Sequence, residues 1–116
     1  PAGPFTVTNN FAIAGAGTAT VTAATNNAKL NIGGDLTIDA DGVFIKGSNW
    51  IAFKNADASV TWTDNNPTKS DMGIVGLSGV SLKTVTLGSS VKATVVVIYV
   101  ANDTLDLGSY ALTLTG

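Results

Sequence analysis

The sequence predicts an all-β fold, a two-sheet, jelly-roll-like sandwich of about nine or ten short strands. Apolar and polar residues alternate along most of the chain, as they do in strands that bury one face, and a helical period of 3.6 is not evident. Glu, Gln and Arg, which favour helices, are absent, while Thr, Val, Gly and Asn are abundant. Turn signals recur about every ten residues, a spacing typical of sandwiches and barrels.

The expected strands follow one another along the whole chain. Gly33-Gly34 has the composition of a tight hairpin turn, and the polar residues 64–71, which include Pro67, are expected to form the longest loop. The stretch GGDLTIDADGVFIKG has the look of one coil of a β-solenoid, but a single unit cannot stack on itself, so the sandwich is preferred. Strands are expected at residues 4–9, 18–23, 28–33, 35–39, 43–47, 49–55, 58–64, 80–88, 92–102 and 110–116.

The length of 116 residues suggests a single domain. Residues 1–14 are expected to form an N-terminal arm, because a short alternating segment is followed by a Gly-Ala-Gly hinge at residues 15–17. Residues 15–116 are expected to form the β-sandwich domain. Apolar residues make up 45% of the chain and charged residues only 12%, which is about half the usual charged share.

The composition argues against several functions. His and Cys are absent, so the commonest catalytic base and the thiol nucleophile are missing, and most of the eight Asp occupy expected turns. We therefore expect neither enzymatic activity nor a cofactor. The six Lys are scattered and the net charge is −2, which argues against nucleic-acid binding. Membrane insertion is not expected, because no apolar run approaches the roughly 18 residues that a membrane helix needs.

The run Val95–Val100 is apolar on both faces, which in a strand normally requires cover on both sides. Three arrangements are open. A loop such as residues 64–79 could cover the second face, the run could lie at a corner shared by two sheets, or another copy of the chain could bury it. The low surface charge favours the third arrangement, because exposed strand edges without charge recruit further strands.

Two stretches carry a resemblance to a known class of protein. PFTVTNNFAIAGAG has the composition of a donor arm, and GSYALTLTG that of a closing strand. In these features the chain resembles the strand-exchanging β-sandwich subunits of extracellular filaments and pili. The resemblance implies a non-enzymatic structural protein, extracellular or on the cell surface, that polymerises with copies of itself by strand donation. The residues expected to insert into a groove of the neighbouring copy are Phe5, Val7, Phe11 and Ile13.

Other functions and sites stay open at this point. A viral coat or decoration protein in a virion would show the same features. A carbohydrate-binding sandwich is a further alternative, with sugar rings stacked on Trp50 or Trp62, although the pattern around Trp62 favours the core. The weak candidates for a metal site are Asp35, Asp39 and Asp41, which alternate around a turn; a structural turn is preferred. Asn102 begins the glycosylation sequon Asn102-Asp103-Thr104.

Overall fold

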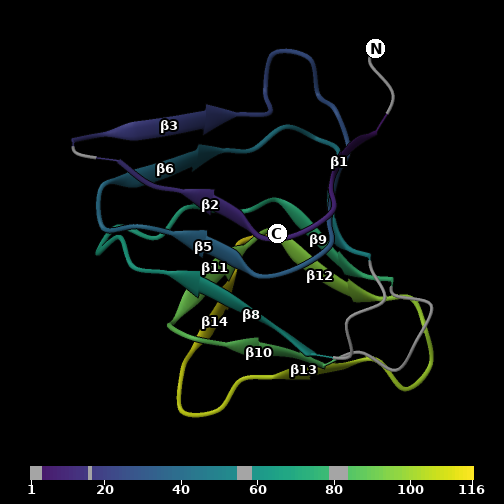
Figure 1. The fold of residues 1–116 in the computed structure, drawn as a ribbon. Coiled ribbons are helices and arrows are strands. Elements are labelled where there is room, and N and C mark those ends of the chain that lie inside the picture. Colours follow the sequence, from purple (N-terminus) through teal and green to yellow (C-terminus); the bar gives the residue numbers. More distant parts are fainter. Residues whose placement is uncertain (1–3, 16, 55–58, 79–83) are drawn as a thin grey trace.

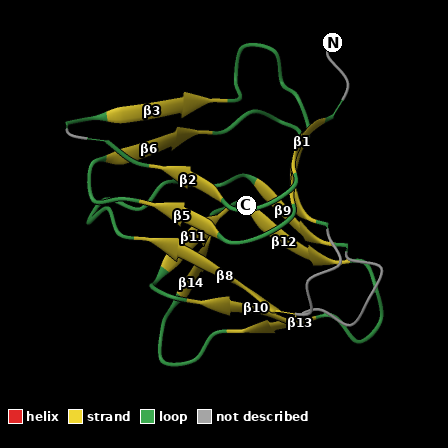
Figure 2. Ribbon diagram, in the orientation of Figure 1, coloured by secondary structure: helices red, strands yellow, loops and turns green. Residues whose placement is uncertain are grey.

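The part of the chain that the structure describes contains fourteen short strands, which follow one another around a common axis. The computed structural model describes residues 4–15, 17–54, 59–78 and 84–116, and within them there is no helix (Figure 2). No segment among these residues is therefore a helix long and apolar enough to span a membrane. Residues 1–3 of the expected arm and Ala16 of the expected hinge lie outside the described residues.

The strands form five stacked layers, one above the other. The third layer has two strands, and residues 70–72 take the place of its third, with a parallel bridge between Asp71 and Lys92. From first to last the layers are β1 (Phe5–Val7), β2 (Phe11–Ile13) and β3 (Ala19–Thr22); β4 (Leu30–Ile32), β5 (Leu36–Ile38) and β6 (Gly42–Ile45); β7 (Trp50–Phe53) and β8 (Ser59–Asp64); β9 (Ile74–Leu77), β10 (Thr84–Leu87) and β11 (Val91–Ala93); and β12 (Val95–Ile98), β13 (Thr104–Asp106) and β14 (Leu112–Leu114).

Three faces run along the stack, and every strand pair in them is parallel. The first face is the sheet β1-β4-β7-β9-β12, and the second is the sheet β2-β5-β8-β10-β13. The third face consists of β3-β6, residues 70–72 and β11-β14. In Figure 1 the second face descends from β2 to β13, so the first layer lies at one end of the stack. After β1 the chain returns to the first face four times, at β4, β7, β9 and β12, so it is a β-solenoid of about four turns.

The predicted jelly-roll-like sandwich with about nine or ten strands is therefore wrong. Alternation shows which residues share a face of a strand, but it does not give the direction of the neighbouring strand. A solenoid strand turns one side to the interior and the other to water, so it alternates like a strand of a sandwich. Parallel sheets usually need helices on both faces. Here the interior of the solenoid covers one face, and no helix is required.

The core is a set of columns in which the same position of successive layers contributes a side chain. Phe53, Trp62 and Leu77 are fully buried in the middle layers, and the rings of Phe53 and Trp62 lie 6.2 Å apart. Burying such a side chain contributes about 1.5–3 kcal/mol. Two of the columns are Leu30, Ile51, Val75 and Val96 on the first face, and Leu36, Trp62 and Leu87 on the second.

Gly33 and Gly34 form the corner between β4 and β5, so the predicted hairpin is also wrong. A Cβ atom on Gly33 would lie 2.0 Å from the carbonyl oxygen of Thr8 in the first layer. The glycines are needed because the two backbones approach closely at this corner. The side chain of Asn10 completes the contact, since its Oδ1 accepts a hydrogen bond of 2.9 Å from the amide of Asp35.

A buried carboxylate shapes the polar segment after β8. Asp64 is 1% exposed, and its two oxygens accept hydrogen bonds from the amides of Asn66 and Ser70, both at 2.9 Å. The hydroxyl of Ser70 in turn accepts a hydrogen bond of 3.0 Å from the amide of Phe44 in the second layer. These bonds bring residues 65–70 round the corner between the second and third faces, where they take the place of a strand ladder.

The apolar run near the C-terminus forms β12, the last strand of the first face. A covering loop at residues 64–79 is not found, because Ile74–Leu77 is β9, which pairs with β12 edge to edge. Val96 and Ile98 share the inner face of β12, and Val95, Val97 and Tyr99 lie on its outer face. Both faces stay partly exposed: Val95 is 39%, Ile98 49% and Tyr99 54% accessible.

Candidate functional site

The fifth layer is an open end of the solenoid, which we call the tail. Its strands β12 and β13 are the last of their sheets, and β14 is the last strand of the third face. The inner-face residues that would be buried in a middle layer are accessible here: Ile98 is 49% and Leu114 54% exposed, and Val96, Leu105 and Leu112 are half-buried. Among the described residues, nothing covers the tail.

Backbone groups at the tail point away from the molecule. The amides of Val95 and Tyr99 donate to β9 and the residue before it, so by alternation the amides of Val96 and Ile98 face the open side. In β14 the amide of Thr115 donates to the carbonyl of Ala93, 3.0 Å away, which leaves the amides of Leu112 and Leu114 facing outward along the axis. The tail therefore exposes backbone hydrogen-bonding groups to which a further strand could pair.

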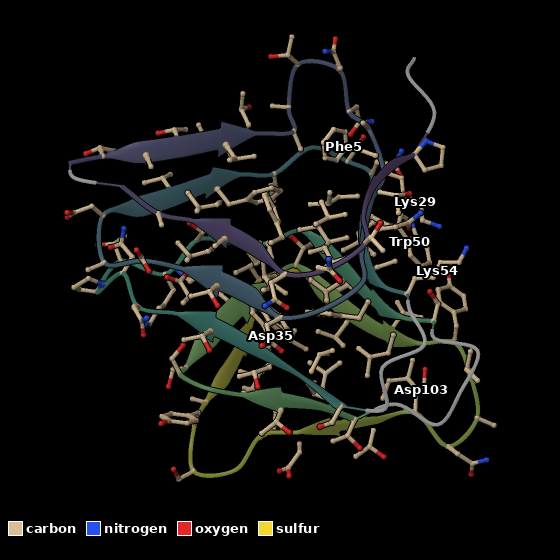
Figure 3. The ribbon with its side chains drawn as sticks, viewed as in Figure 1. Phe5, Lys29, Asp35, Trp50, Lys54 and Asp103 are labelled. Carbon is tan, nitrogen blue, oxygen red and sulfur yellow. The ribbon has the colours of Figure 1, made fainter. Side chains whose placement is uncertain are left out.

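The first layer is the opposite open end, which we call the head. The amides of Phe5, Phe11 and Ala19 donate to the second layer, so those of Thr6 and Ala12 face the open side. Phe5 is 62% exposed and lies at this end in Figure 3. A pocket of about 380 Å³ opens beside it, lined mostly by apolar groups of both layers and of residues 22–28; its lining includes Phe5, Phe11, Val21, Leu30 and Phe44.

One wall of this pocket is fixed by a single asparagine. Asn27 has a positive φ of 51°, and its Oδ1 accepts hydrogen bonds from the amides of Ser48 at 2.6 Å and Asn49 at 2.8 Å. Its Nδ2 donates to the hydroxyl of Ser48 at 2.7 Å. The loop between β3 and β4, which lines the pocket, is thus tied to the turn between β6 and β7.

Charge is distributed unevenly between the middle of the solenoid and its ends. All six Lys and eight Asp lie between Lys29 and Asp106, so the head carries no charged side chain and β12 and β14 carry none either. Soluble proteins normally protect open strand edges with charged residues or proline. The strands of the first layer and two of the three strands of the fifth layer lack charged residues, and Asp106 in β13 is the exception.

The four residues expected to be donated lie in the chain's own first layer. Phe5 and Val7 are in β1, which pairs with β4, and Phe11 and Ile13 are in β2, which pairs with β5. All four point inward. Ile13 is buried, Val7 and Phe11 are half-buried, and Phe5 is exposed.

The two tryptophans have different environments. Trp62 is 0% exposed in the core, so its ring cannot stack on an external sugar. Trp50 lies on the outer surface of the first face and is half-buried (Figure 3). Its ring stacks on that of Tyr99 with centroids 4.8 Å apart, and the amino group of Lys29 lies 5.8 Å from the Trp50 ring. Gly76 makes room for the stack, because a Cβ there would lie 3.2 Å from the indole.

The weak metal candidates are not gathered into a site. Asp35 Oδ1 accepts a hydrogen bond of 2.8 Å from the amide of Thr61, and Asp39 and Asp41 lie in the turn between β5 and β6. In the described part of the chain, no three acidic side chains are close enough to share an ion. Asn102, the glycosylation candidate, is exposed in the turn before β13 with a φ of 74°.

A polar cluster on the third face joins four layers. The Oδ2 atom of Asp71 lies 2.8 Å from the amino group of Lys46 and accepts a hydrogen bond of 2.5 Å from Thr115. The Oδ1 atom accepts bonds from the hydroxyl of Thr94 at 3.0 Å and the amide of Gly73 at 2.9 Å. Partial burial would raise the pKa of Asp71, but the bonds from Lys46, Thr115, Gly73 and Thr94 outweigh it and hold that pKa well below its usual range.

This cluster predicts acid sensitivity of the fold. Since the folded-state pKa of Asp71 is below the unfolded value of 3.8, its contribution is complete at neutral pH and decreases as the pH falls below about 4. Lys46 is 41% exposed, so the ion pair itself adds little, and we expect Asp71→Asn to cost about 1–2 kcal/mol at pH 7. Urea denaturation at pH 7 and pH 3 measures this, and equal losses at both values would contradict the assignment.

Comparison with known proteins identifies no relative: no family model, curated protein or solved structure matches the chain. Its function is therefore inferred from its own geometry. The sequence reasoning missed the inner-face residues of the tail, namely Ile98, Leu112 and Leu114, and the pocket at the head. A signal for both ends was present in the sequence, because no charged residue precedes Lys29 or follows Asp106.

Proposed function

We propose that this chain is a non-enzymatic structural subunit that assembles with copies of itself into an extracellular filament by pairing strands at the open ends of its solenoid. The observation that carries the proposal is the uncovered tail, with unpaired ladders on three faces and exposed apolar side chains on their inner side. An added strand gains backbone hydrogen bonds along its length, and the side chains beside it gain burial.

The energies make such pairing feasible. Five inner-face side chains of the tail are half-buried or exposed, and completing their burial contributes about 1 kcal/mol or more each. Each ladder hydrogen bond adds about 0.5–1.5 kcal/mol. Association costs about 4–15 kcal/mol in lost freedom of motion. Because the apolar contribution alone is near the lower end of this cost, the ladders decide whether the contact is stable.

The pairing proposed here leaves the first layer in place. Donation of Phe5, Val7, Phe11 and Ile13 to a neighbour would break the pairing of β1 with β4 and of β2 with β5. It would also uncover Leu30, which is only 8% exposed. Deleting residues 1–22, which removes β1, β2 and β3 together, separates the two routes. Strand donation predicts that assembly is lost, whereas edge pairing predicts that the second layer takes over as the head.

The tail is tested by a pair of neighbouring substitutions in β14. Leu114 lies on the inner side and Thr113 on the outer side, where Lys92 is its partner. We expect Leu114→Asp to weaken assembly at least about 100-fold, because an unpaired carboxylate would be buried in the contact. Thr113→Asp places the same charge in water and should assemble like the wild type.

Sedimentation over a range of concentrations measures the effect. A wild-type chain that remains at 11.7 kDa at every concentration would contradict self-assembly. Equal behaviour of Leu114→Asp and Thr113→Asp would show that the tail is not the contact. The location outside the cell belongs to this proposal and is checked by labelling the protein on intact source cells.

A second candidate, carbohydrate binding, is favoured by the outer surface of the first face. Trp50 and Tyr99 form a stack there, Tyr99 is 54% exposed, and Lys29 lies beside the Trp50 ring. Aromatic rings with one polar side suit the apolar faces of sugars. Titration with oligosaccharides, followed by Trp fluorescence in the wild type and in Tyr99→Ala, tests this candidate; no change in the wild type would exclude it.

A further inference from the structure

The two ends of the solenoid differ in a way that fixes how copies can join. Resting on the proposed function, we propose that assembly is head to tail. The fifth layer of one copy stacks on the first layer of the next, and all three faces continue through the junction as parallel sheets. The partner of the tail is thus the head of a second copy of this chain.

The order of the faces is the first support for this polarity. β12 and β1 belong to one sheet, β13 and β2 to another, and β14 and β3 to the third face. Because all pairs are parallel, moving a second copy along the axis places each tail strand beside the head strand of the same face, in the same direction. Two tails can meet only if one copy is turned over. This reverses its strands and matches at most one of the three faces.

The unpaired amide and carbonyl groups of the tail are placed to bond those of the head, as the backbone groups of adjacent layers bond each other. Within the first face, inward residues direct their backbone groups toward the tail: the carbonyl of Phe53 accepts from Ser78, and that of Leu77 accepts from Tyr99. The free groups at the tail belong to inward residues, Val96 and Ile98. The free groups at the head belong to an outward residue, Thr6, so the junction repeats the internal pattern.

The internal register predicts the contacts at the junction. Val97 is opposite Gly76 in the pair β12–β9, and Thr6 is opposite Asn31 in the pair β1–β4; all four side-chain positions are on the outer side. Continuation of the sheet places Val97 of one copy opposite Thr6 of the next. It also places Ile98 of one copy next to Val7 of the other, so that the core column of the first face continues through the junction.

The pocket at the head gives the third support. Phe5 and Val21 of the first layer line it, together with Leu30 and Phe44 of the second layer. On the third face, β14 of the adjoining copy would lie over β3, so that Leu112 and Leu114 approach the pocket. Contact between two heads would instead enclose two empty apolar pockets, which forfeits the dispersion contacts of their walls.

Blocking one end at a time tests the polarity. Phe5→Asp blocks the head and Leu114→Asp blocks the tail, and both sites are more than half exposed, so folding is expected to survive. Their controls on the outer side of the same strands are Thr6→Asp and Thr113→Asp. We expect each blocked variant alone to sediment at 11.7 kDa and their equimolar mixture to form a dimer that grows no further.

Two other outcomes would contradict the head-to-tail polarity but would still be consistent with self-assembly. Dimers of Phe5→Asp alone would show contact between tails, and dimers of Leu114→Asp alone would show contact between heads. A wild-type chain that never associates would instead overturn the proposed function itself, so the two failures are distinguishable.

A chemical cross-link provides a measurement that does not depend on blocking. The chain has no Cys, so single cysteines can be placed at will. Opposite residues of neighbouring strands are about 4.8 Å apart, which a disulfide can span. We expect a mixture of Thr6→Cys and Val97→Cys to form the mixed disulfide on oxidation, at least tenfold in excess of either like pair. Predominant Val97→Cys homodimers would contradict the head-to-tail junction.

Discussion

Trp62→Ala should lower the free energy of unfolding by about 3–5 kcal/mol, the loss usual for a large buried aromatic side chain. Trp62 is fully buried between Leu36 and Leu87 in the core of the second face, and its ring lies 6.2 Å from that of Phe53. Domains of this size are stable by only about 5–15 kcal/mol, so the variant is expected to be close to unfolding at 37 °C. Urea denaturation measures the loss.

Trp62→Phe is the matched control for this substitution. The indole nitrogen of Trp62 is buried and has no hydrogen-bond partner among the described residues. Losing the indole N–H group should therefore not lower the stability. Phe retains a ring in the column but is smaller than Trp, so Trp62→Phe is expected to lower the free energy of unfolding by about 1–2 kcal/mol. A loss below about 1 kcal/mol for Trp62→Ala would mean that the ring does not fill the core.

Gly33→Ala is expected to detach the first layer from the second. The added Cβ would lie 2.0 Å from the carbonyl oxygen of Thr8, and this neighbour is backbone, which cannot move without separating the layers. Since the strands of the first layer pair with those of the second layer and with no other described strands, the effect should stay local. Hydrogen exchange should become faster by at least about tenfold at the amides of Phe5 and Phe11, which donate to the second layer, and remain unchanged in β10.

Gly15→Ala is the control within the first layer. Its Cβ would meet only the Cβ of Ala19 at 3.6 Å, which is an ordinary contact, so exchange and stability should stay near wild type. If Gly33→Ala exchanged like Gly15→Ala, the close approach at the corner of residues 33–34 would be contradicted.

The all-β character of the chain could be predicted from the sequence, but its architecture could not. Alternation in residues 30–38 identifies Leu30, Ile32, Leu36 and Ile38 as inward residues, which holds in either fold. The direction of neighbouring strands depends on contacts between residues 20 to 26 positions apart, such as Val85 with Leu105 and Thr61 with Asp35. Because this spacing varies from layer to layer, the chain lacks the fixed period that normally reveals a solenoid.

Gly33 and Gly34 show why the sequence favours a sandwich over a solenoid. GGDLTIDADGVFIKG contains β5 and β6 of the second layer, and its look of a solenoid coil was accurate. Two adjacent glycines, however, suit a hairpin turn as well as a close approach of two backbones. Only the close approach of Thr8 in the first layer to Gly33 distinguishes the two, and this is a property of the stacked layers rather than of the local sequence.

The open ends could be predicted only in part. The shortage of charge indicated that strand edges would be exposed. Association through those edges stays a prediction. Which edges are exposed depends on the position in the stack. The same inward pattern is fully buried at Leu77 in β9 and 49% exposed at Ile98 in β12, because only β9 has a layer on each side.

Fibre diffraction from aligned assemblies tests the central claim most directly. If solenoids join end to end, strands lie across the filament and neighbouring layers are about 4.8 Å apart along its axis. We expect a strong meridional reflection at about 4.8 Å and a subunit repeat near 24 Å, which is five layers at that spacing. Filaments with strands along the axis, or with a repeat set by side-by-side packing, would contradict assembly through the ends of the solenoid.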